Sequence, residues 1–298
     1  RNIFGQGEKL DIDGRVSKRT ASLEGEIEFP NFFSQDVALN LFGEGQLVDR
    51  DNYQSKSVEA GAELSYLIHP KLTVSVGSEV KYSDVRDGLS ANEFYLLSFP
   101  FRATWDTTDD LLDPTRGWVV FAEINPYRDI VNANIEFIKS SVSASVYHTL
   151  DSWLSPTIAV RAATGVISGE ATPDIPADER FYVGGGGSVR GYPFQSLSRE
   201  TLNDEGERIR IGGSSFQELS TELRFRINQD WGIVTFADGG YAFTEDSPEL
   251  NETLLWGAGI GLRYYTLVAP LRLDLAFPLD RRNNDASYQL YISLGQAF

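Results

Sequence analysis

Apolar and polar residues alternate with a period of two along most of the chain. Between residues 58 and 66, for example, one face carries only Val, Ala, Leu and Tyr, and the other carries Glu, Gly and Ser. Successive side chains of a β-strand point to opposite faces, so this period indicates strands with one apolar and one polar face. No segment shows a convincing helical period, and no apolar run approaches the ~18 residues of a membrane-spanning helix. The chain is therefore predicted to be all-β.

The alternating segments predict about fourteen strands. Many of them have about ten residues or more, whereas strands of soluble proteins usually have about five or six. Tilted strands of that length suit the crossing of a lipid bilayer. The predicted strands lie near residues 7–18, 20–29, 36–47, 54–67, 71–83, 92–106, 116–126, 133–149, 153–167, 216–227, 231–243, 254–265, 270–278 and 287–296.

The connections between these strands alternate in length, which favours a membrane barrel. Short turns such as 69–70 and 228–230 alternate with longer charged loops such as 84–91 and 168–215. Outer-membrane barrels have tight periplasmic turns and extended outer loops. We therefore predict a transmembrane antiparallel β-barrel that spans residues 1–298 as one domain. A soluble β-sandwich, which would bury its apolar faces in pairs, is the alternative.

The composition argues against several other classes of protein. A net charge of −17 opposes binding to the phosphates of nucleic acids. The chain has no cysteine and only two histidines, His69 and His148, so we expect no metal centre, no cofactor and no Ser-His-Asp triad. An outer-membrane lipase or protease is the enzymatic alternative, but the chain contains no G-x-S-x-G motif. Because the chain begins at Arg1 and not at Met, we expect a fragment or a processed product.

The longest predicted loop, 168–215, contains the segment "GGGGSVRGY" around Arg190. This segment lacks the GK[ST] ending and the following helix of a phosphate-binding loop, so we discount that interpretation. A guanidinium group folded into a barrel would be partly desolvated and would need carboxylate partners. Glu222 in "STELRF" and Asp238 in "FADGG" follow the loop, so we predict that Arg190 pairs with one or both. A solvated loop arginine is the alternative.

Three glycines, Gly257, Gly259 and Gly261, share one face of the segment "GAGIGLR". No strand-to-helix context supports a dinucleotide-binding fingerprint here. A glycine face within a strand permits another backbone to approach closely. We therefore predict a smooth inner wall at these positions.

The last eleven residues, "YQLYISLGQAF", read as a final strand that ends on an aromatic residue. This pattern resembles the C-terminal signal by which bacterial outer-membrane proteins are recognised for insertion. Gly295 is expected to interrupt the strand and to weaken closure of the barrel. A buried terminal strand is the alternative. The residues predicted to share one face are Tyr288, Leu290, Ile292, Leu294 and Phe298.

Several segments together resemble one known family. They are "DDLLDPTRGW" at 109–118, "SVRGY" in the long loop, "STELRF", "FADGG", "GIGLRYYTLVAPLRLDLAFPL" and the terminal "LYISLGQAF", together with the opening "RNIFGQGEKL". This set resembles the BamA/TamA superfamily of outer-membrane insertases. The stretch from "GGGGSVRGY" to "LGQAF" most resembles the TamA branch, with BamA as the nearer alternative and two-partner secretion transporters further off.

The resemblance implies a sixteen-stranded barrel with periplasmic POTRA domains in front. We find neither a POTRA region nor the first two strands in this sequence, which agrees with about fourteen readable strands. The resemblance also implies that the long loop folds into the lumen and that its arginine contacts acidic residues on the following strands. The residues implied are Val189, Arg190, Gly191 and Tyr192 in the loop, with Glu222, Phe236 and Asp238 as partners.

The function implied by the resemblance is assembly or secretion of outer-membrane proteins, particularly autotransporters, without chemical catalysis. The implied location is the Gram-negative outer membrane. The implied partners are outer-membrane lipid, unfolded clients and a TamB-like protein anchored in the inner membrane. A BamA-type general insertase and a passive diffusion porin are the alternatives, and a porin would share the alternation and the charged lumen.

Overall fold

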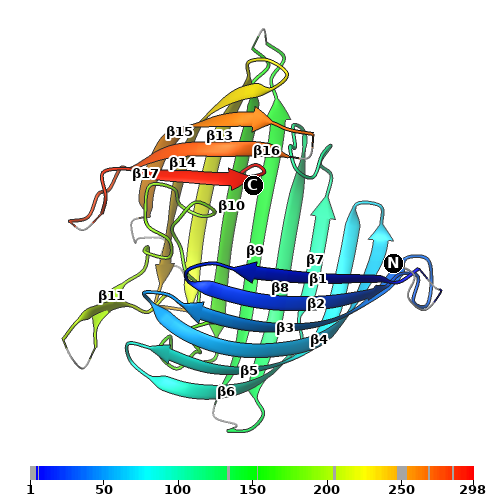
Figure 1. Cartoon of the computed structure of the whole chain (residues 1–298), viewed down its shortest axis with the longest axis vertical. Helices are drawn as coiled ribbons and strands as arrows, with labels where there is room; N and C mark the ends of the chain where they lie inside the picture. Colours follow the sequence, from blue (N-terminus) through cyan, green and yellow to red (C-terminus); the bar gives the residue numbers. More distant parts are fainter. Residues whose placement is uncertain are drawn as a thin grey trace.

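The structure is a computed structural model that describes residues 5, 7–132, 135–152, 154–203, 206–246, 254–267, 269–283 and 285–298. These residues form strands, turns and loops, and none of them lies in a helix that could cross a membrane. Figure 1 shows one large sheet that curves around a central space. The all-β prediction is confirmed.

Among the described residues, fifteen strands form the large sheet, and β11 and β12 form a separate hairpin within the long loop. The strands are β1 (Lys9–Val16), β2 (Thr20–Phe29), β3 (Val37–Asp49), β4 (Tyr53–His69), β5 (Leu72–Asp87), β6 (Ala91–Ser98), β7 (Phe101–Asp106), β8 (Gly117–Asp129), β9 (Glu136–Thr149), β10 (Thr157–Ser168), β11 (Glu200–Leu202), β12 (Arg208–Arg210), β13 (Ser215–Arg226), β14 (Trp231–Phe243), β15 (Leu255–Tyr265), β16 (Pro270–Pro278) and β17 (Gln289–Leu294).

The strands β6 and β7 together make one segment of the wall, because both pair with β5 on one side and with β8 on the other. The prediction had a single strand at 92–106, and the structure divides it at Phe99 and Pro100. Proline has no N–H to contribute to a sheet and interrupts the ladder there. With β6 and β7 taken as one, the wall has the predicted fourteen segments.

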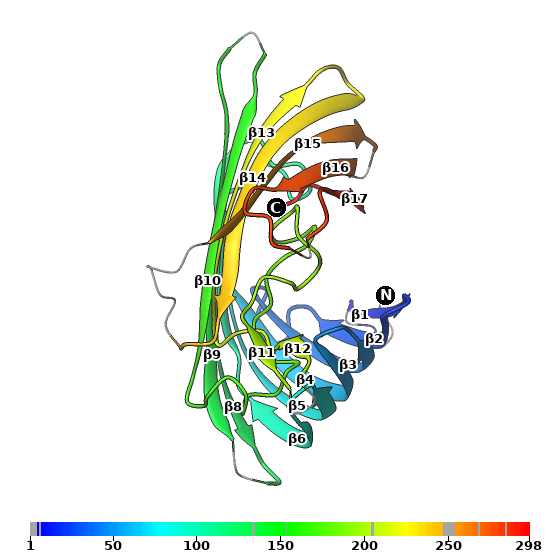
Figure 2. The same cartoon turned by 90° about the vertical axis from the view of Figure 1, so that its left-hand side faces the viewer.

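Each segment of the wall is antiparallel to the next, in the order of the chain, with β10 pairing directly with β13 across the long loop. The two edges of the sheet are β1 and β17, and no pairing joins these two strands in the part of the chain that the structure describes. Figures 1 and 2 show the two edges facing each other across the concave side of the sheet. The predicted transmembrane antiparallel barrel is confirmed as the fold.

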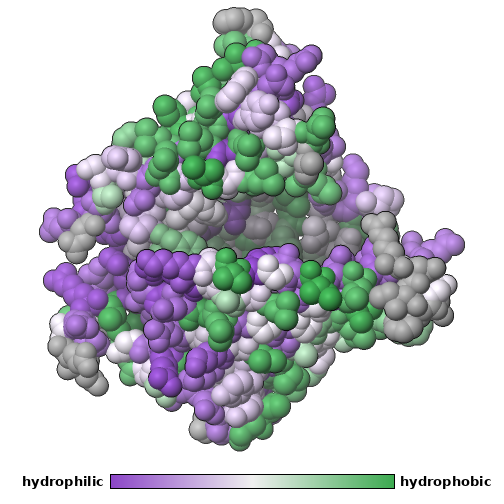
Figure 3. All heavy atoms as spheres, in the orientation of Figure 1, coloured by the Kyte–Doolittle hydropathy of each residue, from purple (hydrophilic) through white to green (hydrophobic). Residues whose placement is uncertain are grey.

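The outer face of the wall is apolar, as the alternation predicted. On β4, Val58 and Tyr66 lie on the outer face and are 62% and 48% exposed. Glu59 and Glu63 lie on the other face of the same strand, toward the lumen, and are less exposed. Large exposed apolar side chains are unfavourable in water but suit contact with lipid. Figure 3 shows hydrophilic residues gathered at the end of the first strands where residues 17–19, 50–52 and 88–90 connect them. The predicted longer loop at 84–91 is wrong, because β5 and β6 extend into it and leave a connection of three residues.

Aromatic pairs lie at the opposite end of the wall, where the turns 70–71, 227–230 and 266–269 connect the strands. Trp105 and Trp118 have ring centroids 5.0 Å apart, and those of Trp231 and Tyr264 are 4.9 Å apart. Each pair joins neighbouring strands. Trp231 and Tyr264 lie beside the short turns 227–230 and 266–269, whereas Trp105 and Trp118 lie beside the longer connection 107–116. Tyr and Trp concentrate at the membrane–water interface of barrels because their rings are amphipathic, so these pairs mark one boundary of the lipid zone.

The long loop, residues 169–214, lies on the concave side of the sheet (Figure 2). It is not structureless, since it contains the β11–β12 hairpin. Val183, Val189, Tyr192 and Leu197 of the loop pack with Ala242 of β14 in a buried apolar cluster. A substantial part of the buried core therefore lies between this loop and the inner wall.

The C-terminal prediction needs one correction. Leu290, Ile292 and Leu294 are exposed on the outer face with Tyr288, as expected, but Phe298 is not on that face. Gly295, with φ of +87°, ends the strand and turns the chain inward. The carbonyl oxygen of Phe298 accepts a hydrogen bond of 2.9 Å from Arg224 Nη2 on the inner wall.

Candidate functional site: the arginine anchor of the long loop

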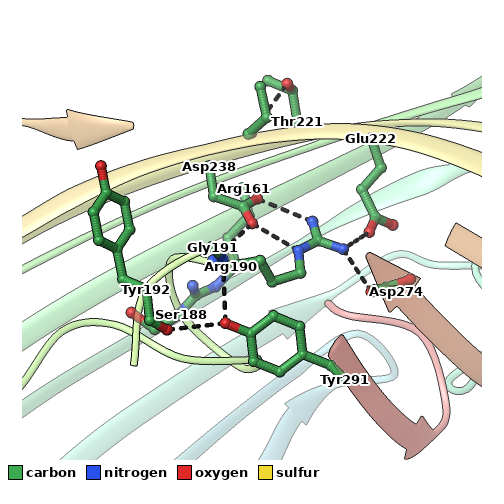
Figure 4. A network of polar contacts seen from close by, with 12 residues as sticks. Arg161, Ser188, Arg190, Gly191, Tyr192, Thr221, Glu222, Asp238, Asp274 and Tyr291 are labelled. Carbon is green, nitrogen blue, oxygen red and sulfur yellow. Dashed lines mark hydrogen bonds and ion pairs between the residues drawn. The ribbon is translucent and has the colours of Figure 1, made fainter. Parts of the chain in front are cut away.

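Arg190 is buried against the inner wall and contacts acidic residues on three strands (Figure 4). Its Nε donates to Asp238 Oδ2 at 2.6 Å and its Nη2 donates to Asp238 Oδ1 at 2.9 Å, a bidentate pair with β14. Its Nη1 donates to Glu222 Oε1 of β13 at 2.7 Å and to Asp274 Oδ2 of β16 at 3.0 Å. Both contacts expected from the sequence are present, and Asp274 is an additional partner.

Further charged residues surround this anchor. Glu222 also accepts from Arg224 Nε at 2.8 Å, and Arg263 forms an ion pair with Asp274. Arg272 also pairs with Asp274. The network therefore has four guanidinium groups and three carboxylate groups, and each of its residues is at most 6% exposed. Isolated buried charges are costly, so a group of this kind is stable only because its members are paired. The residues of the network are Arg190, Glu222, Arg224, Asp238, Arg263, Arg272 and Asp274.

The electrostatic environment keeps Arg190 charged. Burial on its own would lower the pKa of its guanidinium group, but the hydrogen bonds and charge of Asp238, followed by the charges of Glu222 and Asp274, raise the pKa above its ordinary value. The guanidinium carbon also lies 3.5 Å from the ring centroid of Phe236, in a cation–π contact. Phe236, which the resemblance implied as a partner, is therefore part of the site.

The other motif residues shape the loop around Arg190. Val189 and Tyr192 are 1% and 0% exposed, and the Tyr192 hydroxyl donates to the carbonyl oxygen of Trp256 at 2.9 Å. Gly191 has φ of +100°, a conformation that favours glycine, and a Cβ there would lie 2.9 Å from the carbonyl carbon of Phe277. These residues let the loop turn directly on the wall.

The smooth inner wall predicted at the glycines of β15 is present where the loop crosses Gly257. A Cβ atom at Gly257 would overlap the carbonyl oxygen of Arg190. The loop backbone therefore occupies the space that a side chain at this position would fill, as expected of a close approach between two backbones.

A second set of contacts ties the same loop to the first half of the wall. Lys81 of β5 pairs with Asp178 at 2.8 Å and with Glu179 at 2.6 Å, and Lys139 of β9 pairs with Glu179 at 3.1 Å. Arg180 pairs with Asp87 at the end of β5 at 2.8 Å. The loop is thus joined to strands on both sides of the barrel.

Sequence reasoning missed Asp274, the arginines around it and the lysine contacts of Asp178 and Glu179. For Asp274 a signal existed, because alternation in "LRLDLAF" places it on the inward face with Arg272. For Lys81 and Glu179 no signal existed, because the path of the loop decides which wall residues it meets. In the described part of the chain, no group of three or more metal-ligating side chains is arranged to hold an ion. The arrangement is suited to holding a loop in place.

Comparison with known sequences identifies the family. The Omp85 superfamily domain matches residues 2–298. Two relatives, each named outer membrane protein assembly factor BamA, are 26% identical over 323 residues in Nitratidesulfovibrio vulgaris and 23% identical over 357 residues in Neisseria meningitidis serogroup B. Each alignment covers 100% of this chain, but the chain spans only 39% and 44% of the length of these relatives.

Solved structures show the same fold. BamA from Haemophilus ducreyi lacking POTRA domains 1–3 has a TM-score of 0.82 and 16% identity, over 97% of this chain and 64% of that chain. CdiB from Escherichia coli has a TM-score of 0.61 and 16% identity, over 98% of this chain and 56% of that chain. The family match, the sequence relatives and the shared fold agree: the chain belongs to the Omp85 superfamily and is a β-barrel protein of the Gram-negative outer membrane.

Proposed function

We propose that this chain forms the barrel of an outer-membrane protein assembly factor, which helps β-barrel clients to be inserted or secreted. The observation that carries the proposal is the buried anchor that holds Arg190 to Glu222, Asp238 and Asp274. Diffusion through an open lumen does not require a long loop tethered inside it by buried charges. The names of the two BamA relatives support the same function.

The proposed mechanism requires no covalent chemistry and no cofactor. The edge strand β17 pairs with β16 through only six residues, Gln289–Leu294. An unpaired backbone N–H or C=O in lipid costs several kcal/mol, so a free strand edge favours pairing with an incoming strand. In this proposal a client strand pairs at the edge of β17, by the same main-chain hydrogen bonds that extend sheets elsewhere.

The client class and the partner belong to the same proposal. The stretch of sequence that begins at "GGGGSVRGY" and ends at "LGQAF" resembles the TamA branch. This resemblance supports autotransporters as clients and a TamB-like protein, anchored in the inner membrane, as partner. It also supports two further strands and POTRA domains as parts of the whole protein. A BamA-type general insertase is the second candidate, and the two BamA relatives favour it.

Client folding tests the proposal. The intact protein would be reconstituted in lipid vesicles and mixed with either a urea-denatured autotransporter barrel or a denatured porin-type barrel, and protease-protected client would be measured over time. We expect faster folding of both clients than in empty vesicles, with the larger acceleration for the autotransporter. Equal acceleration would favour the general insertase, and no acceleration of either client would contradict the proposed function.

A further inference from the structure

Tyr291 joins the edge strand β17 to the long loop. Outward side chains of this strand, Leu290 and Ile292, are 56% and 75% exposed, whereas Tyr291 between them points to the lumen side (Figure 4). Side chains of a strand alternate between its two faces, so Tyr291 lies on the inward face. Its aromatic side chain meets the loop at the two residues that follow Arg190.

The hydroxyl group of Tyr291 binds two neighbouring backbone groups of the loop. It donates to the carbonyl oxygen of Tyr192 at 2.9 Å and accepts from the N–H of Gly191 at 3.1 Å. A phenol can do both at once because its oxygen is donor and acceptor. The contact therefore fixes the strand to the segment that follows Arg190 in the chain.

The ring of Tyr291 packs on a different part of the loop. A Cβ atom at Gly186 would lie 2.8 Å from its Cδ1 atom, so the loop backbone lies directly against the ring. Arg272 of β16 donates from Nη2 to the carbonyl oxygen of Gly186 at 3.0 Å. The loop segment around Gly186 is thus held to β16 and β17 together.

These contacts matter because they act on β17 itself, whereas its other contacts are the pairing with β16 and those of the tail that follows, where Gln296 and Phe298 bond to the inner wall. The strand β17 is the edge of the sheet and pairs with β16 over six residues. Elements near a chain end that have few buried contacts open at a lower free energy than the core, and a short edge strand is of this kind. The loop, by contrast, is fixed to β13, β14 and β16 through the buried charges of Arg190.

We propose that Tyr291 is a positioning residue that holds the edge strand in the register and twist needed for pairing with a client strand. The Arg190 anchor acts on this strand through the Tyr291 hydroxyl group. The consequence for clients rests on the proposed function, whereas the effect on the order of β17 does not.

The variant Tyr291→Phe tests this role, because it keeps the ring against Gly186 and removes both hydrogen bonds. We expect backbone amides of β17 to exchange hydrogen for deuterium roughly 5- to 30-fold faster, with no change in β13 or β14. The matched control is Tyr264→Phe, which removes a hydroxyl group from a half-exposed ring on the outer face of β15. We expect this control to leave amide exchange unchanged in β17, β13 and β14.

A second variant tests the connection to Arg190. We expect Arg190→Lys to speed exchange in β17 of the otherwise natural protein, and to have a much smaller effect when Tyr291→Phe is already present, because interacting residues are not additive. Equal effects of Arg190→Lys in both backgrounds would overturn the connection. Unchanged β17 exchange in Tyr291→Phe would overturn the whole inference.

Client folding separates this inference from the proposed function. If the natural protein accelerates client folding, we expect Tyr291→Phe to slow it and Tyr264→Phe to leave it unchanged. Faster β17 exchange without slower client folding would overturn the role of Tyr291 in client pairing. If the natural protein accelerates no client, the proposed function fails, and the exchange measurements still decide whether Tyr291 orders the strand.

Discussion

Arg190 and Asp238 are joined by three hydrogen bonds. The guanidinium Nε and Nη2 atoms donate at 2.6 and 2.9 Å to the two carboxylate oxygens, and the backbone N–H of Arg190 donates to Oδ2 at 3.2 Å. Only a guanidinium group offers this planar, two-point fit to a carboxylate. Because the loop backbone and side chain share one acceptor, Asp238 fixes both the position and the direction of the loop on β14.

Removal of this guanidinium group should destabilise the barrel. Arg190→Ala leaves Glu222 and Asp238 buried with less charge compensation, so we expect the free energy of unfolding to fall by about 3–5 kcal/mol. Arg190→Lys keeps the charge but loses the bidentate fit, so we expect a smaller loss. Urea unfolding in lipid vesicles measures both.

The control for these variants is Arg208→Ala, which removes a loop arginine whose side chain is 79% exposed. We expect a change within about 0.5 kcal/mol there, as is usual at exposed positions. A loss in Arg190→Ala no larger than in this control would show that the buried network does not stabilise the fold.

Ion conductance should distinguish an assembly factor from a porin. If the loop obstructs the lumen, the natural protein conducts poorly in a planar bilayer, and Arg190→Ala raises the conductance by releasing the loop. The measurement is single-channel current at fixed salt and voltage. A natural protein that already conducts as well as the variant would favour the porin.

The strands were predictable because one physical rule acts at every position of the wall. Lipid on one side and a polar lumen on the other impose a period of two, as the confirmed strand at 231–243 illustrates. The partners of Arg190 were predictable for a related reason, since a buried guanidinium group requires carboxylates. Alternation places Asp274 on the inward face, but its contact with Arg190 also depends on the register that sets this residue opposite Gly261 of β15, and alternation does not give that register.

The inward turn of Phe298 was not predictable from alternation. The interruption of the strand at Gly295 was expected, and β17 does end at Leu294. A period of two nevertheless places Phe298 on the outer face, and it does not give the positive φ of Gly295 that turns the chain inward. The turn then leads to Arg224, a contact between residues 74 positions apart that no local pattern encodes. The ion pair of Lys81 with Glu179 was missed for the same reason, as these residues are 98 positions apart.

Acid should weaken the attachment of the loop to the first half of the wall. Burial on its own would raise the pKa of Glu179, but the ammonium groups of Lys81 and Lys139 outweigh it and lower the pKa from an ordinary 4.5 to about 2. The ionised carboxylate therefore stabilises the folded protein fully above pH 4.5, and this contribution disappears as the pH falls from 4.5 towards 2. Urea unfolding across this range measures it.

The matched variant for the acid effect is Glu179→Gln, which cannot ionise. We expect the difference in unfolding free energy between the natural protein and this variant to be constant above pH 4.5 and to shrink below it. A difference that stays constant down to pH 2 would contradict the role of the Glu179 charge.

A methyl group at Gly257 should displace the long loop. In Gly257→Ala the new Cβ would overlap the carbonyl oxygen of Arg190, so either the loop or β15 must move. Overpacking of this kind typically costs about 1–3 kcal/mol. Gly187→Ala is the matched control, since a Cβ there meets nothing within 4 Å. We expect protease to cleave residues 169–214 faster in Gly257→Ala than in Gly187→Ala. Equal cleavage would mean that the loop does not need this close approach, and that the buried charges alone keep it on the wall.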